Sequence, residues 1–344
     1  MQKKSQKPPE QHWMKTQCKW PLVLLLMSLS TYALLFFWSS GNSNIKWPKA
    51  TLLVPSPVNN SHLFTGYTSM STQQPLQMHC NQCALVTSSG HLLNSNLGST
   101  IDVAECVVRM NDAPTQTFEK DVGRRTTLRV VAHSSVTSFA KHAKELLEAT
   151  GRNQYSTLVV VWGPPKQMRA DGHGATYNAL QRLRTRVPGL DPYLVTNLRL
   201  QAFDDLYEQE TGIDRMKSHT WLSTGWFTMG VLLDVCSHVH IYGMIPSDYC
   251  RPSPLKGIMP LQENSVCNVK PSSAHADYLR SNPKHHAVKY HYYENRSGGE
   301  CQTYTKHAHA HNGGHHRFFI EKRVFARWAL RYNITFSHPS WPGL

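Results

Sequence analysis

The chain has 344 residues, enough for one large α/β domain or two small ones. Its glycine, proline and charged contents are ordinary, so a packed globular domain is expected rather than a disordered chain. The formal net charge of +14 favours an anionic ligand, membrane or glycan surface. The basic residues are scattered along the chain rather than gathered on one helix, which argues against a protein that binds nucleic acid.

The N-terminal region sets the expected compartment. Residues 1–19 carry several lysines and precede an apolar run at residues 20–38. At about 1.5 Å per residue, this run matches the ~30 Å hydrocarbon core of a bilayer. The lysines are expected to stay cytosolic, so residues 20–38 are predicted to be a type II signal anchor with the rest of the chain in the lumen. A cleaved signal peptide is the alternative, and it would need a shorter apolar core and a cleavage site of small residues.

The next region is polar. Residues 39–78 are rich in Ser, Asn, Thr, Pro and Gln without a sustained hydrophobic period, and they are predicted to form an extended stem. The lumenal domain is therefore predicted to span residues 79–344. Three sequons are candidates for glycosylation, at Asn59, Asn295 and Asn333.

The lumenal domain alternates between strand and helix patterns. Apolar runs bounded by turn residues predict strands at Ala84–Thr87, Cys106–Met110, Thr127–Ala132, Thr157–Trp162, Tyr193–Thr196 and Val239–Met244. Helical spacing predicts helices at Phe139–Thr150, Ala175–Val187, Leu198–Thr211 and Phe318–Arg331. This order predicts an α/β fold with a mostly parallel sheet and helices on both faces.

Small polar residues follow the first two predicted strands. Ser88, Ser89 and Gly90 precede a predicted helix that begins at His91, and such a helix N-terminus favours a bound phosphate. Asn111 follows the second strand, at the carboxyl edge where α/β sheets bind ligands, and could hydrogen-bond a base or ribose. For each piece alone, a plain polar turn is the simpler interpretation.

Taken together and in this order, the residues from Cys83 to Thr127 closely resemble the large sialylmotif of eukaryotic sialyltransferases. The residues that carry the resemblance are Cys83-Ala84-Leu85-Val86, Ser89-Gly90, Ile101-Asp102, Val108-Arg109-Met110-Asn111-Asp112-Ala113-Pro114 and Asp121-Val122-Gly123-Arg124-Arg125-Thr126-Thr127. In that family this region binds the CMP part of CMP-sialic acid. Thr87-Ser88 stand where many members have Gly-Asn. This form resembles the α-N-acetylgalactosaminide α2,6-sialyltransferases that act on already sialylated acceptors, such as the ganglioside GD1α synthases.

A second region carries another resemblance. Ser223, Thr224 and Gly225 precede a predicted helix, and an N-cap is the ordinary reason for such residues. The stretch also resembles the small sialylmotif of the family, at these three residues and from Cys236 to Tyr242-Gly243. The resemblance implies contact with donor and acceptor. The hydroxyls and the helix N-terminus would then hold a carboxylate, such as that of sialic acid.

Two short motifs follow near the C-terminus. His291-Tyr292-Tyr293-Glu294 resembles the third motif of the family, and His316 with Glu321 matches its last motif, His-x4-Glu. The helix after His316 would place the ring at its positive end, which favours a neutral general base. Residues five apart on a helix point about 140° from each other. Glu321 is therefore predicted to be a structural anchor rather than a partner of His316.

Two features suggest a metal site, but other interpretations are favoured. The cluster of His307, His309, His311, His315 and His316 contains glycines and is predicted to be a lid. Asp204-Asp205 lies within a helix pattern and lacks the Asp-x-Asp spacing of sugar-nucleotide metal sites. Helix N-termini and basic groups can neutralise the one phosphate of the donor, and the family is metal-independent. No metal and no cofactor are therefore predicted.

Seven of the eight cysteines are predicted to be lumenal, where disulfides persist. The resemblance implies the bridges Cys83–Cys236 and Cys250–Cys301. It leaves Cys80 and Cys106 for a third bridge and Cys267 without a partner. Cys267 lies in residues 252–281, an insertion without periodicity that related sequences lack. Such a segment is either a disordered loop or an artefact of the gene model.

Together, the residues and the resemblance predict a Golgi sialyltransferase with a GT-A-like α/β fold. The donor is CMP-sialic acid, and the acceptor is the 6-hydroxyl of GalNAc in a sialylated Gal-GalNAc glycan of a ganglioside or an O-glycan. His316 removes the acceptor proton, CMP leaves, and the anomeric centre inverts through an oxocarbenium-like transition state. Two alternatives stay open: a sialyltransferase of α2,8 or α2,3 linkage, and a catalytically silent glycan-binding protein.

Overall fold

A computed structural model describes residues 64–147, 157–250, 288–295, 298–308, 315–341 and 343. The predicted signal anchor (20–38), the insertion (252–281) and the sequon at Asn59 lie outside these residues. None of the helices within the described ranges is long and apolar enough to cross a membrane. The anchor therefore stays a prediction.

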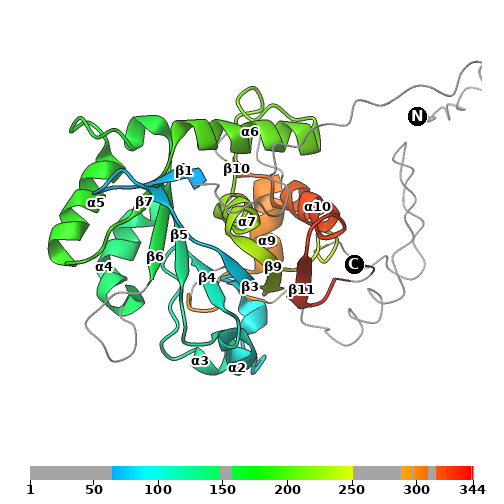
Figure 1. Cartoon of the computed structure of the whole chain (residues 1–344). Helices are drawn as coiled ribbons and strands as arrows, with labels where there is room; N and C mark the ends of the chain where they lie inside the picture. Colours follow the sequence, from blue (N-terminus) through cyan, green and yellow to red (C-terminus); the bar gives the residue numbers. More distant parts are fainter. Residues whose placement is uncertain are drawn as a thin grey trace, which may run out of the picture. The chain divides into compact units, whose positions relative to one another are not determined.

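A nine-stranded sheet organises these residues (Figure 1). Its strands, in spatial order, are β11 (Ile334–His338), β9 (Cys236–Tyr242), β3 (Cys80–Val86), β4 (Cys106–Met110), β5 (Leu128–Ala132), β6 (Leu158–Trp162), β7 (Tyr193–Val195), β1 (Phe64–Ser69) and β2 (Pro75–Leu76). All neighbours from β11 to β7 pair in parallel, and β1 and β2 add an antiparallel edge. The short strands β8 (Thr220–Trp221) and β10 (His315–His316) form a separate parallel pair.

Helices cover both faces of the sheet, as the alternating pattern predicts (Figure 1). One face carries α6 (Asn197–Thr211), α7 (Thr224–Val235) and α10 (Phe318–Ala329). The opposite face carries α2 (Gly98–Asp102), α3 (Glu119–Val122), α4 (Val136–Leu147) and α5 (Ala175–Arg186). Helix α9 (Glu300–Ala308) packs against α10. The prediction of a mostly parallel α/β fold is confirmed.

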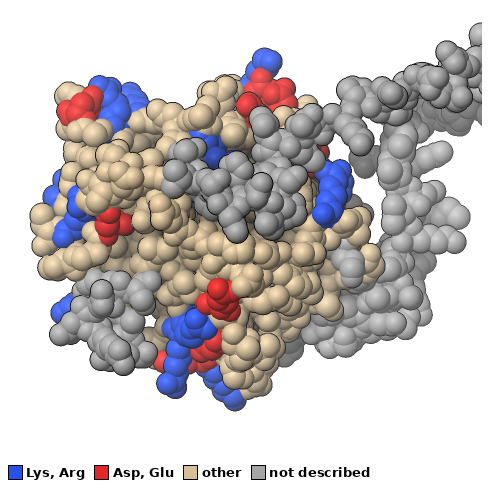
Figure 2. Space-filling view, viewed as in Figure 1, with Lys and Arg blue, Asp and Glu red and all other residues tan. Residues whose placement is uncertain are grey.

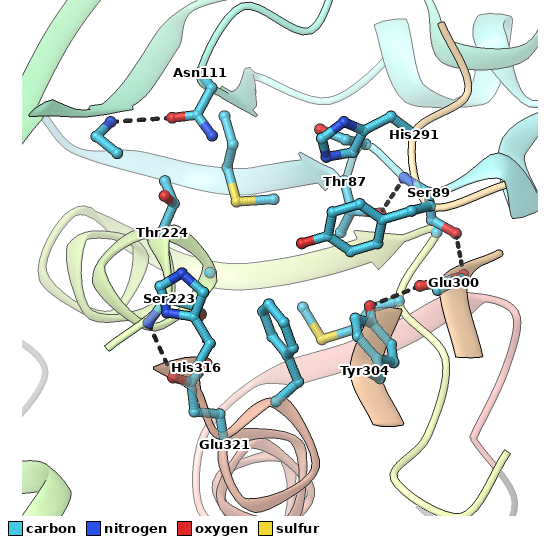
Figure 3. Close-up of a pocket in the computed structure, with 18 of the residues that line it drawn as sticks. Thr87, Ser89, Asn111, Ser223, Thr224, His291, Glu300, Tyr304, His316 and Glu321 are labelled. Atoms are coloured by element: carbon cyan, nitrogen blue, oxygen red, sulfur yellow. Dashed lines mark hydrogen bonds between the residues drawn. The ribbon is translucent and has the colours of Figure 1, made fainter. Parts of the chain in front are cut away.

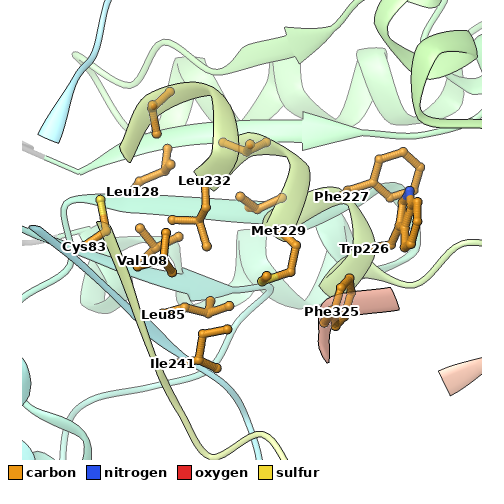
Figure 4. Packing of buried hydrophobic residues seen from close by; sticks show 14 of the residues in the cluster. Cys83, Leu85, Val108, Leu128, Trp226, Phe227, Met229, Leu232, Ile241 and Phe325 are labelled. Atoms are coloured by element: carbon orange, nitrogen blue, oxygen red, sulfur yellow. The ribbon is translucent and has the colours of Figure 1, made fainter. Parts of the chain in front are cut away.

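The helix α7 lies at the centre of the larger core. Its sequence is apolar nearly all round, which is typical of a fully buried helix. Met229 and Leu232 pack on Leu85, Val108 and Leu128 of the sheet (Figure 4). Burial of one such side chain stabilises the folded state by about 1.5–3 kcal/mol. This packing holds α7, and therefore its N-terminus, against the sheet.

The predicted boundary of the stem, at residue 78, is wrong. Strand β1 lies in the predicted stem, yet it pairs with β7, and Tyr67 is fully buried. The hydroxyl of Tyr67 donates a hydrogen bond to Asp234 of α7 at 2.6 Å. The sequence around β1 is polar and has no hydrophobic period, so it did not predict a strand. The strand is buried only because it pairs with segments far away in the sequence. The folded domain therefore includes residues from Phe64 onward.

All three predicted disulfides are present. Cys83–Cys236 and Cys80–Cys106 join β3 to its two neighbours, β9 and β4. Cys250–Cys301 joins the segment after β9 to α9. Cys267 lies outside the described residues. The bridges hold together the strands whose ends form the candidate site.

The visible face of the molecule carries charged side chains of both signs. On the face seen in Figure 2, lysine and arginine side chains lie at several separate places, some of them beside acidic side chains. The two described sequon asparagines, Asn295 and Asn333, are both exposed. Whether either carries a glycan stays a prediction.

Candidate active site

A pocket of about 270 Å³ opens at the carboxyl ends of β3, β4, β5 and β9. From β3 the chain builds the sheet outward to β7 and then returns to place β9 on the other side of β3. Ligands of open α/β sheets bind where the strand order reverses in this way. The pocket gathers most of the predicted site residues: Ser88, Ser89, Asn111, Ser223, Thr224, Gly225, His291, His316 and Glu321.

Asn111 presents its amide nitrogen to this pocket. It follows β4 with a φ of 48°, in the left-handed region that asparagine tolerates. Its side-chain oxygen Oδ1 accepts a hydrogen bond from the backbone N–H of Ala132 at 3.0 Å (Figure 3). Because Oδ1 is used, Nδ2 is the group that can donate to a ligand. A base carbonyl or a ribose oxygen is a suitable acceptor.

Two fully buried arginines shape the loops around Asn111. Arg129 donates through Nη1 to the carbonyl of Asn111 at 2.8 Å. Arg109 donates through Nη2 to the carbonyls of Val122 and Arg125 at 2.7 and 2.9 Å. Burial, together with the neighbouring charge of Arg109, lowers the pKa of Arg129 to about 10. Arg109 and Arg129 therefore hold backbone segments in place. Asn111 is the residue of this motif that remains available to contact a ligand.

The prediction that a helix begins at His91 is wrong. Gly90–Leu92 form a three-residue 3-10 turn, which is too short to present the dipole of a helix. The hydroxyl of Ser89 donates to Glu300 at 2.8 Å and accepts from the backbone N–H of His91 at 3.2 Å. Ser89 is therefore engaged within the protein, and Gly90 does not line the pocket. A phosphate at this turn would meet Ser88 first.

The third motif packs against this turn. The backbone N–H of Tyr292 donates to the carbonyl of Ser88 at 2.8 Å, and that of Gly90 donates to Lys289 at 3.0 Å. A Cβ on Gly90 would lie 2.7 Å from the Lys289 carbonyl oxygen, so this close approach requires glycine. The buried hydroxyl of Tyr292 donates to the carbonyl of Pro114 at 2.5 Å, and burial raises its pKa to about 12. The motif thus links the ends of β3 and β4.

His291 stands in a column of rings at the edge of the pocket. It stacks between Tyr290 and Tyr293, with ring centroids 4.4 and 5.2 Å away. Its Nδ1 lies 2.8 Å from a carboxylate oxygen of Glu294. Of the four motif residues, His291 alone lines the pocket, where it lies across from His316 (Figure 3). An imidazole oriented by a carboxylate can donate a hydrogen bond to an anionic oxygen.

The carboxylate that binds at Ser223 comes from the protein itself. Glu321 accepts hydrogen bonds from the backbone N–H of Ser223 at 2.9 Å and from its hydroxyl (Figure 3). The Ser223 oxygen also accepts from the N–H of Trp226 and so caps α7. These contacts agree with an anchor role for Glu321. The Ser223 hydroxyl is therefore engaged within the protein, and Thr224 and Gly225 remain as candidates for a ligand carboxylate.

His316 is oriented by the neighbouring strand. It lies in β10, directly before α10, as its position in the motif predicts. Its Nδ1 lies 2.9 Å from the carbonyl oxygen of Trp221. Because a carbonyl only accepts, Nδ1 carries the proton, and the neutral ring keeps its lone pair on Nε2. The ring also stacks on His307, with centroids 5.5 Å apart. A ring in this state can accept a proton at Nε2, and the role of general base stays a prediction.

Three buried residues at the pocket were not identified from the sequence: Glu300, Tyr304 and Lys322. The Tyr304 hydroxyl donates to Glu300 at 2.7 Å. Lys322 follows Glu321 in α10 and shares the apolar face that holds Phe325. The sequence did contain one indication of Lys322: Glu321 and Lys322 are charged residues on the face of α10 that its apolar pattern predicts to be buried.

The described residues contain no group of three or more side chains that could hold a metal ion. His309 and His311 lie outside these residues, as does the predicted lid between α9 and β10. Asp204 forms an ion pair with Arg215, as a solvated helix face allows. Metal independence therefore stays a prediction.

Comparison with known proteins places the chain in one family. Residues 56–254 match the model of glycosyltransferase family 29 (sialyltransferase). An α-N-acetylgalactosaminide α2,6-sialyltransferase 6 of Mus musculus is 40% identical, with 92% of this chain and 86% of the relative covered. A human α-N-acetyl-neuraminyl-2,3-β-galactosyl-1,3-N-acetyl-galactosaminide α2,6-sialyltransferase is 39% identical, with 84% and 83% covered.

A solved structure is also similar. The crystal structure of a mammalian sialyltransferase matches with 19% identity and a TM-score of 0.39, covering 75% of this chain and 68% of that one. The family assignment rests on the sequence matches, which extend over most of the chain. The chain belongs to glycosyltransferase family 29, the sialyltransferases.

Proposed function

We propose that the protein transfers sialic acid from CMP-sialic acid to the 6-hydroxyl of GalNAc in sialylated Gal-GalNAc glycans, with inversion at the anomeric carbon. The names of the mouse and human relatives support the α2,6 linkage to GalNAc. The name of the human relative also describes an acceptor that already carries sialic acid. The observation that carries the chemistry is the contact of His316 Nδ1 with the Trp221 carbonyl, because it leaves Nε2 free of a proton.

The reaction needs one proton transfer and one displacement. Nε2 of His316 accepts the proton of the acceptor 6-hydroxyl as its oxygen bonds to the anomeric carbon of sialic acid. The bond from that carbon to the phosphate oxygen breaks, and its electron pair leaves with CMP. The transition state resembles an oxocarbenium ion, so the site must position the reactants and support the departing phosphate.

The remaining groups of the pocket have separate roles in this proposal. Asn111 donates through Nδ2 to the cytidine part of the donor. His291, held by Glu294, donates to the phosphate from the side opposite His316. Thr224 and Gly225, at the N-terminus of α7, hold the sialic acid carboxylate, because Ser223 is already bound to Glu321.

The fold and topology complete the proposal. The parallel sheet with its reversal between β3 and β9 supports a GT-A-like arrangement. Residues 20–38 anchor the chain in the Golgi membrane, and the segment up to Phe64 forms a lumenal stem. The disulfides and the three sequons are compatible with this compartment.

The test is transfer from CMP-sialic acid by membranes that contain the full-length chain. Matched acceptors are sialyl-α2,3-Gal-β1,3-GalNAc linked to an aglycone, the same glycan without sialic acid, and a ganglioside with the same terminal sequence. We expect transfer to the sialylated acceptors, with the new linkage at the GalNAc 6-hydroxyl by methylation analysis. A product with an α2,8 or α2,3 linkage would contradict the acceptor assignment. Binding of the glycan without CMP release would indicate a silent homologue.

A further inference from the structure

One tryptophan lies exposed beside the candidate general base. Trp221 is 37% exposed, whereas the other tryptophans that the structure describes are at most 6% exposed. These are Trp162, Trp226, Trp328 and Trp341. Aromatic side chains commonly line ligand sites, so an exposed ring next to a pocket is a candidate contact for a ligand. The mechanism proposed above uses only the backbone carbonyl of Trp221 and gives its ring no role.

The contacts of Trp221 place it at the rim of the pocket. In the pair of β8 and β10, Trp221 is the register partner of His316, and its carbonyl oxygen lies 2.9 Å from His316 Nδ1. The Trp221 ring also stacks on His133, with centroids 6.1 Å apart and an angle of 25° between the planes. His133 lies between Ala132 and Ser134, which both line the pocket. Trp221 therefore touches residues from two parts of the pocket wall without being part of the lining itself.

The core of the protein holds the Trp221 ring in place. Its neighbour His133 meets the buried ring of Trp162 edge to face, with centroids 5.7 Å apart. Trp162 in turn stacks on Phe227 of α7 at 4.0 Å, and both belong to the larger core. These rings form a series from the core to the rim, and Trp221 is its outermost member. A side chain that is already held in this way loses little conformational freedom when a ligand packs on it.

The proposed reaction determines which part of the acceptor can reach this ring. The attacking oxygen is the 6-hydroxyl of GalNAc, and it must lie against Nε2 of His316. Only C6 separates that oxygen from the sugar ring, so the GalNAc ring lies beside the base and next to Trp221. In a galacto-configured sugar, the hydrogens on C3, C4 and C5 form an apolar patch on one face, adjacent to C6. An indole ring can pack on this patch while the 6-hydroxyl points at the base.

We infer that the Trp221 ring binds the GalNAc of the acceptor and directs its 6-hydroxyl toward His316. Trp221 is thus a residue of acceptor binding, and its ring takes no part in proton transfer or in donor binding. This inference rests on the proposed function, because the base defines where the GalNAc must lie.

The test is the steady-state kinetics of three variants of the full-length chain: Trp221→Ala, Trp221→Phe and Trp221→Leu. Trp221→Ala should raise the KM for the glycan acceptor about tenfold, because the sugar loses its packing partner. Trp221→Phe keeps a ring and should lose less than Trp221→Leu, which keeps only apolar bulk. The matched control is Leu198→Ala, at an exposed apolar position on α6, and it should behave as the wild type.

The other kinetic constants separate acceptor binding from damage to the site. The KM for CMP-sialic acid should stay within about twofold of the wild-type value in all three variants. The kcat should also change little, because every variant keeps the backbone carbonyl that orients His316. Equal acceptor KM values in Trp221→Phe and Trp221→Leu would refute the inference. So would a rise of the donor and acceptor KM values by the same factor, or a loss confined to kcat.

A pair of acceptors shows which sugar packs on the ring. Sialyl-α2,3-Gal-β1,3-GalNAc and Gal-β1,3-GalNAc share the GalNAc, so Trp221→Ala should weaken both by the same factor. Where transfer to the second glycan is too slow, its inhibition constant replaces KM. A loss confined to the sialylated glycan would mean that the ring contacts the sialic acid of the acceptor, and the assignment to GalNAc would be wrong.

A folding defect and a failure of the proposed function give different results. If Trp221→Ala does not fold, the comparison of Trp221→Phe with Trp221→Leu decides, and equal acceptor KM values refute the inference. If the wild-type chain transfers no sialic acid, the proposed function fails. Binding of the two glycans to the full-length chain in the presence of CMP then replaces KM. Equal affinities in Trp221→Phe and Trp221→Leu would refute the contact in that case too.

Discussion

The two halves of the pocket are held in different ways. Around Asn111, the buried Arg109 and Arg129 bond to backbone carbonyls that lie 13 to 18 residues away in the sequence. Around His316, the contacts reach Trp221 and Ser223, which lie 95 and 98 residues away from their partners. In the half around Asn111, which contacts the cytidine in the proposed function (the donor half), these arginine contacts are nearly local and lie within one motif. The half with the base is assembled only when distant segments meet.

The largest effect is expected in the half with the base. His316→Ala removes the general base, so kcat should fall by about 10²–10⁴-fold. Binding of CMP should stay near the wild-type value, because the donor half does not depend on the imidazole. Transfer kinetics and CMP titration on the same preparation check both. A variant with the wild-type kcat would show that the base lies elsewhere.

In the donor half, the expected effect of a substitution is a loss of folding stability. Arg109→Met leaves several buried carbonyls without a donor and should lower the free energy of unfolding by about 3 kcal/mol. Denaturant unfolding measures this change. The exposed Arg124 is the matched control, and Arg124→Met should change stability by less than about 0.5 kcal/mol. Equal effects of the two substitutions would contradict the role given to Arg109.

A smaller effect is expected at Asn111. Asn111→Asp keeps an oxygen for the N–H of Ala132 but replaces the amide donor that faces the pocket. CMP affinity should therefore fall about tenfold, while the free energy of unfolding changes little. Asn197→Asp, at an exposed position at the start of α6, is the control. Unchanged affinity in Asn111→Asp would remove this residue from the donor site.

No effect is expected from metal removal. In the proposed function, the donor phosphate is supported by His291 and the sialic acid carboxylate by the N-terminus of α7, so excess EDTA should leave the transfer rate unchanged. Loss of activity that manganese restores would overturn this prediction. The histidines from His307 to His316 would then be the candidate metal ligands.

The sequence alone determined much of the framework. Hydrophobic periodicity is a property of neighbouring residues, so β4 was predicted with its observed bounds and α5 and α6 within one residue of theirs. The motif pattern led to the sialyltransferase family, which the comparisons confirm. It also placed Asn111 and His316, which the fold brings to one pocket.

Only the tertiary structure decided which polar groups are used inside the protein. The burial of Tyr67 depends on Asp234, and the engagement of Ser223 depends on Glu321. Lys322 is an ordinary charged residue in the sequence, and its burial beside Glu321 follows from the packing of α10. A buried hydrogen bond between residues far apart in the chain leaves no local pattern, because each partner alone is also typical of a solvated surface.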